Sequence, residues 1–168
     1  MHEVSMEKAG ALVAEQLPKG VFLCVGGDTP NVMTIGWGGL AYYWRKHVFV
    51  APVRRQRFTY PCLKKEMAFT VCIPHPGTMV QEVAQAGTLS GRDGDKFAAI
   101  GLKTGRGREV NAPVVEGCAL YLECVVRAQN AFTQEQTDEA ITQASYSAGD
   151  FHELFYGEIV ACWAGEEK

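Results

Sequence analysis

The chain has 168 residues, of which 47% are hydrophobic and 21% are charged, a composition typical of one globular domain spanning the chain. This length can bury a core without disulfides or a structural metal. A formal net charge of −3 gives no general attraction to nucleic acid or to an anionic membrane, so an anion site would have to be a local cluster. No apolar segment approaches the ~20 residues that a membrane-spanning helix needs. We therefore expect no nucleic-acid or membrane partner.

Cysteine usage points to a reducing compartment. The six cysteines are widely spaced, form no C-x-x-C pair and mostly lie in apolar, strand-like segments. Buried, reduced thiols are the interpretation that this spacing favours, and no metal site is predicted. The N-terminal segment MHEVSMEKAG carries charges and lacks the apolar core of a secretory signal. The sequence therefore predicts a cytoplasmic protein.

The first part of the chain predicts a helix followed by a strand. Residues 6–16 are rich in Ala, Leu, Val and Glu, and Pro18 ends that helical pattern. Val21–Val25 is a compact apolar strand. The sequence Gly-Gly-Asp-Thr-Pro that follows is dense in turn formers and should reverse the chain.

The stretch from Asn31 to Trp44, NVMTIGWGGLAYYW, has no charged residue and contains three glycines. Glycine inside a strand pattern marks a bulge, a bend or a place where a ligand or another backbone comes close. We therefore expect a strand whose backbone is approached closely. The competing interpretation is that Trp37, Tyr42, Tyr43 and Trp44 fill a core or a subunit interface.

Three arginines follow the next predicted strand, the apolar segment His47–Val53: they are Arg54, Arg55 and Arg57. Thr59 and the proline two residues later suit the start of a helix. Guanidinium groups beside a helix N-terminus form a natural receptor for phosphate, because the free N–H groups and the helix dipole also favour an anion. The alternative is a solvated basic patch.

Short elements alternate with polar connections in the middle of the chain. Met67–Ile73 is a predicted strand, Thr78–Ala86 is a short helix ended by Gly87, and Asp95 starts another short helix that finishes at Gly101. The mobile polar connection KTGRGRE that follows lacks the third glycine and the preceding strand of a dinucleotide-binding fingerprint. No Walker phosphate loop, H-E-x-x-H or G-x-S-x-G motif occurs, so the standard hydrolase and nucleotide-hydrolysing classes lose support.

The segment TLSGRDGDKF, residues 88–97, is a second candidate for anion binding. It combines hydroxyl groups, glycines and charges in front of an apolar position. Such a loop can close over a polar ligand with the hydroxyl of Ser90, backbone N–H groups and the ammonium of Lys96. The alternative is a surface turn whose charges pair with one another.

The last third of the chain contains the clearest strand pattern. In Ala119–Arg127, apolar residues alternate with Tyr121, Glu123, Val125 and Arg127, which predicts a half-exposed antiparallel strand. Residues 128–149 are polar and predict a loop with a little helix around Asp138–Thr142, and Glu153–Trp163 is a final strand. Several short strands with few helices favour an antiparallel barrel over a doubly wound sheet.

Four motifs together resemble one family. Asn31–Gly39 fits N-x-M-T-[IL]-[SG]-W-G-G, Arg54–Thr59 fits R-x-S-R-[YF]-T with one exception, Gly87–Phe97 fits G-T-x-S-G-R-D-x-D-K-F, and Gly149–His152 fits G-D-[YF]-H. Their order and spacing are similar to those of the flavin reductase-like proteins with an FMN-binding split barrel, particularly the flavoredoxin branch.

Three residues depart from the pattern of that family. Gln56 stands where the family usually has Ser, and Arg55 stands where it often has Pro, both in the expected phosphate-binding turn. Ala86 replaces a common Cys. An amide can still donate to phosphate, but the side chains of this turn differ from those of the family.

The resemblance implies a mainly β, six-stranded antiparallel Greek-key split barrel with a few short helices, which forms a homodimer with FMN near the subunit interface. It also implies a set of cofactor-binding residues: Asn31, Val32, Met33, Thr34, Gly36, Trp37, Arg54, Gln56, Arg57, Thr59, Ser90, Gly91, Arg92 and Lys96. His152 is the catalytic candidate, because the matching segment places a histidine near the flavin ring. The alternative is a histidine that is simply satisfied by the surrounding protein.

The function that the resemblance implies is that of an FMN-dependent oxidoreductase. NADH or NADPH would give hydride to FMN, and the electrons would pass to a small-molecule or protein acceptor. One alternative is an FMN-binding electron carrier that a partner protein reduces. Another is a barrel that binds a different ligand or has lost flavin.

Overall fold

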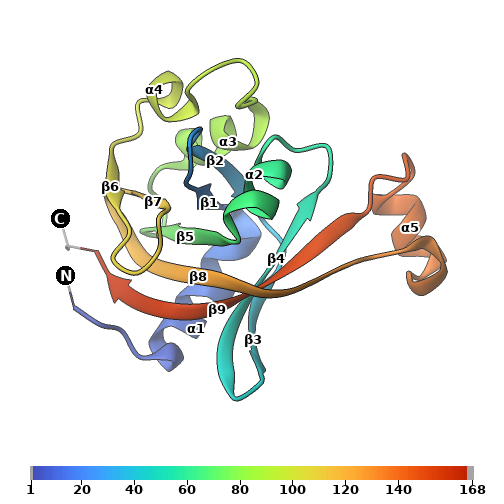
Figure 1. The fold of residues 1–168 in the computed structure, drawn as a ribbon, viewed down its shortest axis with the longest axis horizontal. Helices are drawn as coiled ribbons and strands as arrows, with labels where there is room; N and C mark the ends of the chain where they lie inside the picture. Colours follow the sequence, from blue (N-terminus) through green and yellow to red (C-terminus); the bar gives the residue numbers. More distant parts are fainter. Residues whose placement is uncertain (1, 166–168) are drawn as a thin grey trace.

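The computed structural model describes residues 2–165, and its main element is a seven-stranded antiparallel sheet (Figure 1). The strand order is β2-β1-β5-β8-β9-β4-β3, and β2 also contacts β4, so the sheet curls toward a barrel. The predicted class, a mainly β split barrel, is confirmed. The strands are β1 (Val21–Val25), β2 (Asn31–Ile35), β3 (Gly39–Tyr43), β4 (Lys46–Arg54), β5 (Ala68–Pro74), β8 (Cys118–Ala131) and β9 (His152–Ala164).

The glycine-rich stretch from Asn31 to Trp44 forms two strands rather than one, which is why the sheet has seven strands and not the predicted six. The extended strand conformation is interrupted between Ile35, the end of β2, and Gly39, the start of β3. Gly38 has φ +112°, and a Cβ there would lie 2.2 Å from the carbonyl oxygen of Val50 on β4. The predicted close approach at this glycine is therefore to a neighbouring backbone.

Seven short helices surround the sheet among the described residues: α1 (Met6–Gln16), η1 (Leu17–Lys19), α2 (Thr59–Glu66), α3 (Val80–Thr88), α4 (Lys96–Ile100), η2 (Gln134–Gln136) and α5 (Glu139–Ser145). The helix predicted over residues 6–16 is confirmed, with Ser5 as its N-cap. Asp95 caps α4 by accepting from the N–H groups of Phe97 and Ala98. α3 starts two residues later than predicted, because Met79 takes a left-handed conformation directly before the helix. The helix also runs through Gly87 and ends at Thr88.

Both faces of the central strands are buried. One face packs inside the barrel around Phe49, Phe69 and Phe155, and the other lies under α3, α4 and a small hairpin of β6 (Thr104–Arg106) and β7 (Pro113–Val115). The half-exposed pattern predicted for Ala119–Arg127 is therefore wrong at Tyr121 and Glu123, since the hairpin segment covers their face. The polar connection predicted at residues 103–109 supplies β6 and so is part of this second layer.

The fully buried Glu123 shows how the second layer is attached. Its carboxylate accepts hydrogen bonds from the backbone N–H groups of Arg108, Glu109 and Val110 at 2.7–3.1 Å and from Nε1 of Trp163 at 2.8 Å. Four donors compensate the desolvated charge, so this carboxylate ties the segment after β6 to the sheet.

β8 and β9 lead to η2 and α5 at one end of the sheet, far from the chain termini (Figure 1), and β4 stays paired with β9 as far as Arg54 and His152. We call residues 131–151 the arm. β8 continues to Ala131, so the loop predicted for residues 128–149 begins later than expected, while the predicted small helix is present as α5. No helix within residues 2–165 is long and apolar enough to cross a membrane.

Candidate functional site

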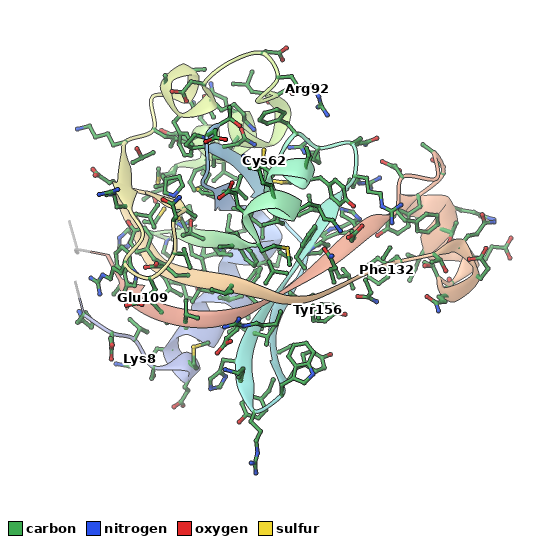
Figure 2. The ribbon with its side chains drawn as sticks, viewed as in Figure 1. Lys8, Cys62, Arg92, Glu109, Phe132 and Tyr156 are labelled. Carbon is green, nitrogen blue, oxygen red and sulfur yellow. The ribbon has the colours of Figure 1, made fainter. Side chains whose placement is uncertain are left out.

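A cavity of about 210 Å³, which we call the anion cradle, lies where three segments meet. β2 supplies Asn31 and Met33, the turn from β4 into α2 supplies residues 56–59, and the end of α3 with the following loop supplies residues 88–92. Lys96, the first residue of α4, completes the wall. Arg92 projects at the top of the molecule (Figure 2). The two segments proposed from sequence to hold an anion thus face one cavity.

Three cationic side chains line the anion cradle without a carboxylate partner among the described residues: Arg57, Lys96 and the exposed Arg92. Lys96 is 3% exposed and its Nζ donates to the carbonyl oxygen of Ala86 at 2.7 Å, while Nη2 of Arg57 donates to the carbonyl oxygen of Gly87 at 2.8 Å. None of these three cations forms a salt bridge within residues 2–165. Burial and the charge of Arg57 lower the pKa of Lys96 to about 8, and burial lowers the pKa of Arg57. An anion in this cavity would stabilise both charges.

Neutral groups set the shape of the anion cradle. Nδ2 of Asn31 donates to Oγ1 of Thr59 at 2.8 Å, and both side chains are buried. Thr59 therefore does not cap the helix as the sequence suggested, and α2 begins after Phe58 without a side-chain cap. A Cβ on Gly91 would lie 2.6 Å from Oδ1 of Asn31 and 2.4 Å from the Phe58 ring, so glycine allows this loop to close. The uncapped start of α2 adds partial positive charge.

A second group of side chains, the aromatic–histidine cluster, consists of Trp37, Arg54, Tyr146, Asp150 and His152. Arg54 at the end of β4 is the register partner of His152 at the start of β9. The ring centroids of Trp37 and His152 are 5.0 Å apart, and the Arg54 guanidinium lies 5.3 Å from the centre of the Tyr146 ring. Arg54 also forms an ion pair with Asp150. The cluster therefore joins β4, the break after β2 and the arm.

His152 is neutral in this cluster. Burial, followed by the positive charge of Arg54, lowers its pKa to about 4, although Asp150 acts in the opposite direction. The hydroxyl of Tyr146 lies 2.9 Å from Nδ1 of His152, and burial raises the pKa of this phenol, so the hydroxyl keeps its proton. We infer that Tyr146 donates to Nδ1, which leaves the ring proton on Nε2.

Comparison with known proteins identifies the family. A family model described as a flavin reductase like domain matches residues 14–168, nearly the whole chain. The chain belongs to the flavin reductase-like family. The family resemblance inferred from the four sequence motifs is confirmed.

Three proteins that are similar to this flavin reductase-like chain share less than 30% identity with it. An uncharacterized protein of Archaeoglobus fulgidus is 29% identical over 150 residues, covering 89% of this chain and 74% of the relative. The structure of a flavoredoxin of Desulfovibrio vulgaris matches with a TM-score of 0.69 and 24% identity, over 88% of this chain and 69% of that one. The NADH:FAD oxidoreductase SgcE6 of Streptomyces globisporus gives a TM-score of 0.67 and 16% identity, over 98% and 87%. Both structural matches establish a shared fold.

Most of the cofactor residues expected from the family motifs meet at the anion cradle. They are Asn31, Met33, Gln56, Arg57, Thr59, Ser90, Gly91, Arg92 and Lys96. Trp37 and Arg54 lie instead in the aromatic–histidine cluster with His152. Arg54 is directed away from the anion cradle, because its guanidinium is held by Asp150 and by the carbonyl oxygen of Ser145.

The remaining expected residues of β2 lie outside both groups. Val32 is fully buried in the core on the opposite face, and the hydroxyl of Thr34 donates to the carbonyl oxygen of Val83 in α3. Gly36 lies in the break after β2. Tyr146 was missed, because the polar stretch around it has no period, and only the adjacent family motif that contains His152 could have drawn attention to it.

Proposed function

We propose that this protein binds FMN, transfers a hydride to it from NADH or NADPH, and passes the electrons to a second acceptor. The observation that carries the proposal is the pair of cations, Arg57 and Lys96, facing one cavity with no salt bridge among the described residues. A terminal phosphate, as in FMN, would supply the missing negative charge and accept hydrogen bonds from both. The residues of the anion cradle therefore fit this cofactor.

In this proposal, the side chains of the anion cradle and of the aromatic–histidine cluster bind and orient FMN. Bound FMN would supply the redox chemistry. Gln56, Ser90 and Arg92 would complete the phosphate contacts at the anion cradle, and Asn31 and Met33 would line its inner wall. At the aromatic–histidine cluster, Trp37 would exclude water from the flavin ring, and neutral His152 would donate a hydrogen bond from Nε2. No side chain has to act as a general acid or base.

The reductant, the assembly and the location are finer parts of the proposal. The likeness to a protein named NADH:FAD oxidoreductase supports a nicotinamide reductant. A homodimer is supported by exposed aromatic side chains at the β3–β4 hairpin, where Tyr43 and Trp44 pack beside Tyr156. Tyr156 is labelled in Figure 2. The absence of disulfides among the six cysteines is consistent with a reducing cytoplasm.

Titration of the protein with FMN tests the proposal. Replacing Arg57 or Lys96 with Ala should weaken FMN binding by ~1.5–3 kcal/mol each, as expected for a hydrogen bond to a charged group. Replacing the exposed Lys65, which pairs with Asp28, should leave affinity unchanged. Protein that fails to bind FMN, or variants that bind it as tightly as the parent, would refute the phosphate role.

Anaerobic stopped-flow reduction tests the source of electrons. Fast bleaching of bound FMN by NADH or NADPH is the expected result. Bleaching only by a reduced protein donor would instead support the alternative of an electron carrier. The spectrum of reduced protein mixed with candidate acceptors would then identify the acceptor class.

A further inference from the structure

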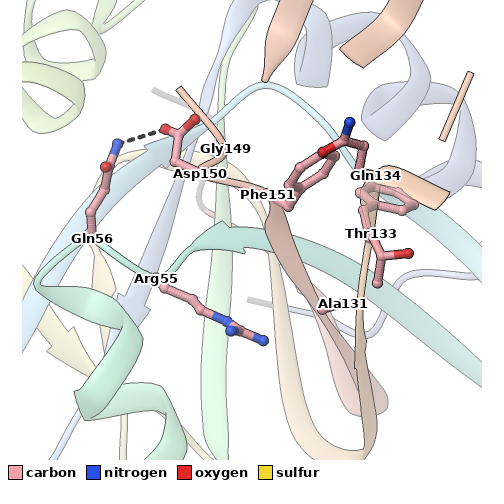
Figure 3. Close-up of a pocket in the computed structure, with 9 residues that line it drawn as sticks. Arg55, Gln56, Ala131, Thr133, Gln134, Gly149, Asp150 and Phe151 are labelled. Atoms are coloured by element: carbon pink, nitrogen blue, oxygen red, sulfur yellow. Dashed lines mark hydrogen bonds between the residues drawn. The ribbon is translucent and has the colours of Figure 1, made fainter. Parts of the chain in front are cut away.

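A second cavity, of about 430 Å³, lies between the turn after β4 and the arm (Figure 3). We call it the arm cavity. Figure 3 shows Arg55 and Gln56 on one side and Phe151, Gln134 and Thr133 on the other. Gln56 also lines the anion cradle, so the two cavities are neighbours. The volume is within the range of small-molecule sites.

Arg55 is the cation that lines the arm cavity. Nε of Arg55 and Nζ of Lys64 both contact the carboxylate of Glu153, each at 3.3 Å, so two cations share one buried anion. The carboxylate that lines the arm cavity, Asp150, is compensated by Arg54 and by the amide of Gln56. Arg55 is therefore the lining group of the arm cavity that can bind an anion.

The guanidinium of Arg55 has donors to spare. Its Nε donates to Glu153, whereas its two Nη groups have no hydrogen-bond partner in the part of the chain that the structure describes. The side chain is 64% exposed, and Arg55 lines the arm cavity. Parallel Nη donors can bind a carboxylate or a phosphate through two hydrogen bonds.

Aromatic side chains form the opposite wall of the arm cavity. Phe132 is 38% exposed, a large apolar group left open to solvent at this place. The Phe151 ring is stacked on Tyr146 with centroids 4.5 Å apart and planes at 21°, which fixes its orientation. A second flat ring could therefore pack here against apolar surface that is already in position.

Arg55 and Gln56, two of the three residues that depart from the family pattern, both line the arm cavity. The anion cradle does not explain Arg55, because that side chain lies outside it. We propose that the arm cavity binds a planar aromatic compound that carries an anionic group, with the anion on Arg55 and the ring against Phe132 and Phe151. This binding does not require flavin and stands apart from the function proposed above.

Binding of simple probes tests the site. Benzoate and adenosine 2′-phosphate distinguish a free aromatic acid from a nucleotide as the source of this chemistry, and benzamide, adenosine and acetate are the matched controls. In ¹H–¹⁵N NMR titrations we expect one of the two anionic aromatic probes to shift signals of the Arg55 side chain and of residues 131–134 and 149–151. Absence of both shifts, or equal binding of the uncharged or ring-free controls, overturns the proposal.

Variants separate the site from its surroundings. Arg55→Ala should weaken binding of the active probe about tenfold or more, and Phe132→Ala should also weaken it. Lys64→Ala removes the other cation at Glu153 without altering the lining of the arm cavity, so it should change probe affinity little. Arg55→Lys keeps the charge and replaces Arg55→Ala as the test variant if Arg55→Ala does not fold. It should bind the active probe less tightly than the parent does, because lysine lacks the paired donors of the guanidinium.

FMN affinity provides an independent readout. Arg55→Ala and Phe132→Ala should bind FMN as the parent does, since neither side chain lines the anion cradle. Failure of the parent to bind FMN would refute the proposed function while leaving the arm cavity testable. Probe affinity that is unchanged in both variants refutes the arm cavity alone.

Discussion

The hydroxyl of Tyr146 lies 2.9 Å from Nδ1 of His152, and this contact joins the arm to the first residue of β9. The Tyr146 ring also contacts the Arg54 guanidinium and is stacked on the Phe151 ring. The arm therefore determines which nitrogen of His152 is left for a ligand, and we infer that it is the protonated Nε2.

Tyr146→Phe should change the state of His152 with little change in packing. Loss of a hydrogen bond that stabilises the neutral ring is worth ~1 kcal/mol, so the pKa of His152 should rise by up to roughly one unit from its value of about 4. The Nε2-protonated form should also lose its dominance. NMR of the imidazole nitrogens during a pH titration measures both, and an unchanged tautomer would contradict the donor role of Tyr146.

Mild acid should destabilise the protein through His152. Its pKa is about 4 in the folded chain and near 6.5 when unfolded, so the unfolded state binds more protons between these values. The contribution of neutral His152 to the free energy of unfolding is fully present above pH 6.5 and is lost as the pH falls toward 4. We expect this loss to be about 2 kcal/mol after allowance for partial solvent access. Urea unfolding of the parent and of His152→Gln measures this, and the variant should show the shallower pH dependence.

FMN binding should take up protons at pH 8 to 9. The pKa of Lys96 is about 8 without an anion, and a phosphate beside it would raise that pKa. Calorimetry in buffers of different ionisation enthalpy counts the protons, with an expected uptake of up to about one per FMN. Lys96→Met should abolish the uptake, and its flavin-free form should be no less stable than the parent because a buried charge is removed. Equal uptake by parent and variant would exclude Lys96 as the group.

Gly91→Ala should damage the anion cradle. The new Cβ would meet the Phe58 ring at 2.4 Å and Oδ1 of Asn31 at 2.6 Å, so the loop has to shift. We expect a loss of about 1–3 kcal/mol in unfolding free energy and a matching fall in FMN affinity. Gly10→Ala in α1 is the control, since its nearest neighbour is 3.7 Å away and alanine favours the helix. Similar effects of both substitutions would contradict the close-approach argument.

Glu123→Gln should lower the unfolding free energy by about 3 kcal/mol or more. The substitution places an NH₂ group among four hydrogen-bond donors and leaves part of them unsatisfied in a buried place. The exposed Glu116, in the turn between β7 and β8, provides the control substitution Glu116→Gln. Urea denaturation compares the two, and equal stability would show that the buried carboxylate is not required.

The candidate site was predictable to the extent that it is built from short motifs. Residues 31–33, 56–59 and 88–96 each carry a local pattern, and the family motifs linked them before the fold was known. The destination of Arg54 was not predictable, because it depends on Asp150 and Ser145, which lie more than 90 positions further along the chain.

The sequence by itself determined the family, the strands and the segments that supply the anion cradle, because apolar period, turn residues and motif spacing are local properties. Only the tertiary structure decided which strands are buried on both faces, as β8 is at Glu123, which lies under the β6–β7 hairpin. It also decided that three arginines within four positions lie in three environments: Arg54 in the aromatic–histidine cluster, Arg55 at the arm cavity and Arg57 at the anion cradle. The physical reason is that a side chain's partner is set by the segments that fold against it.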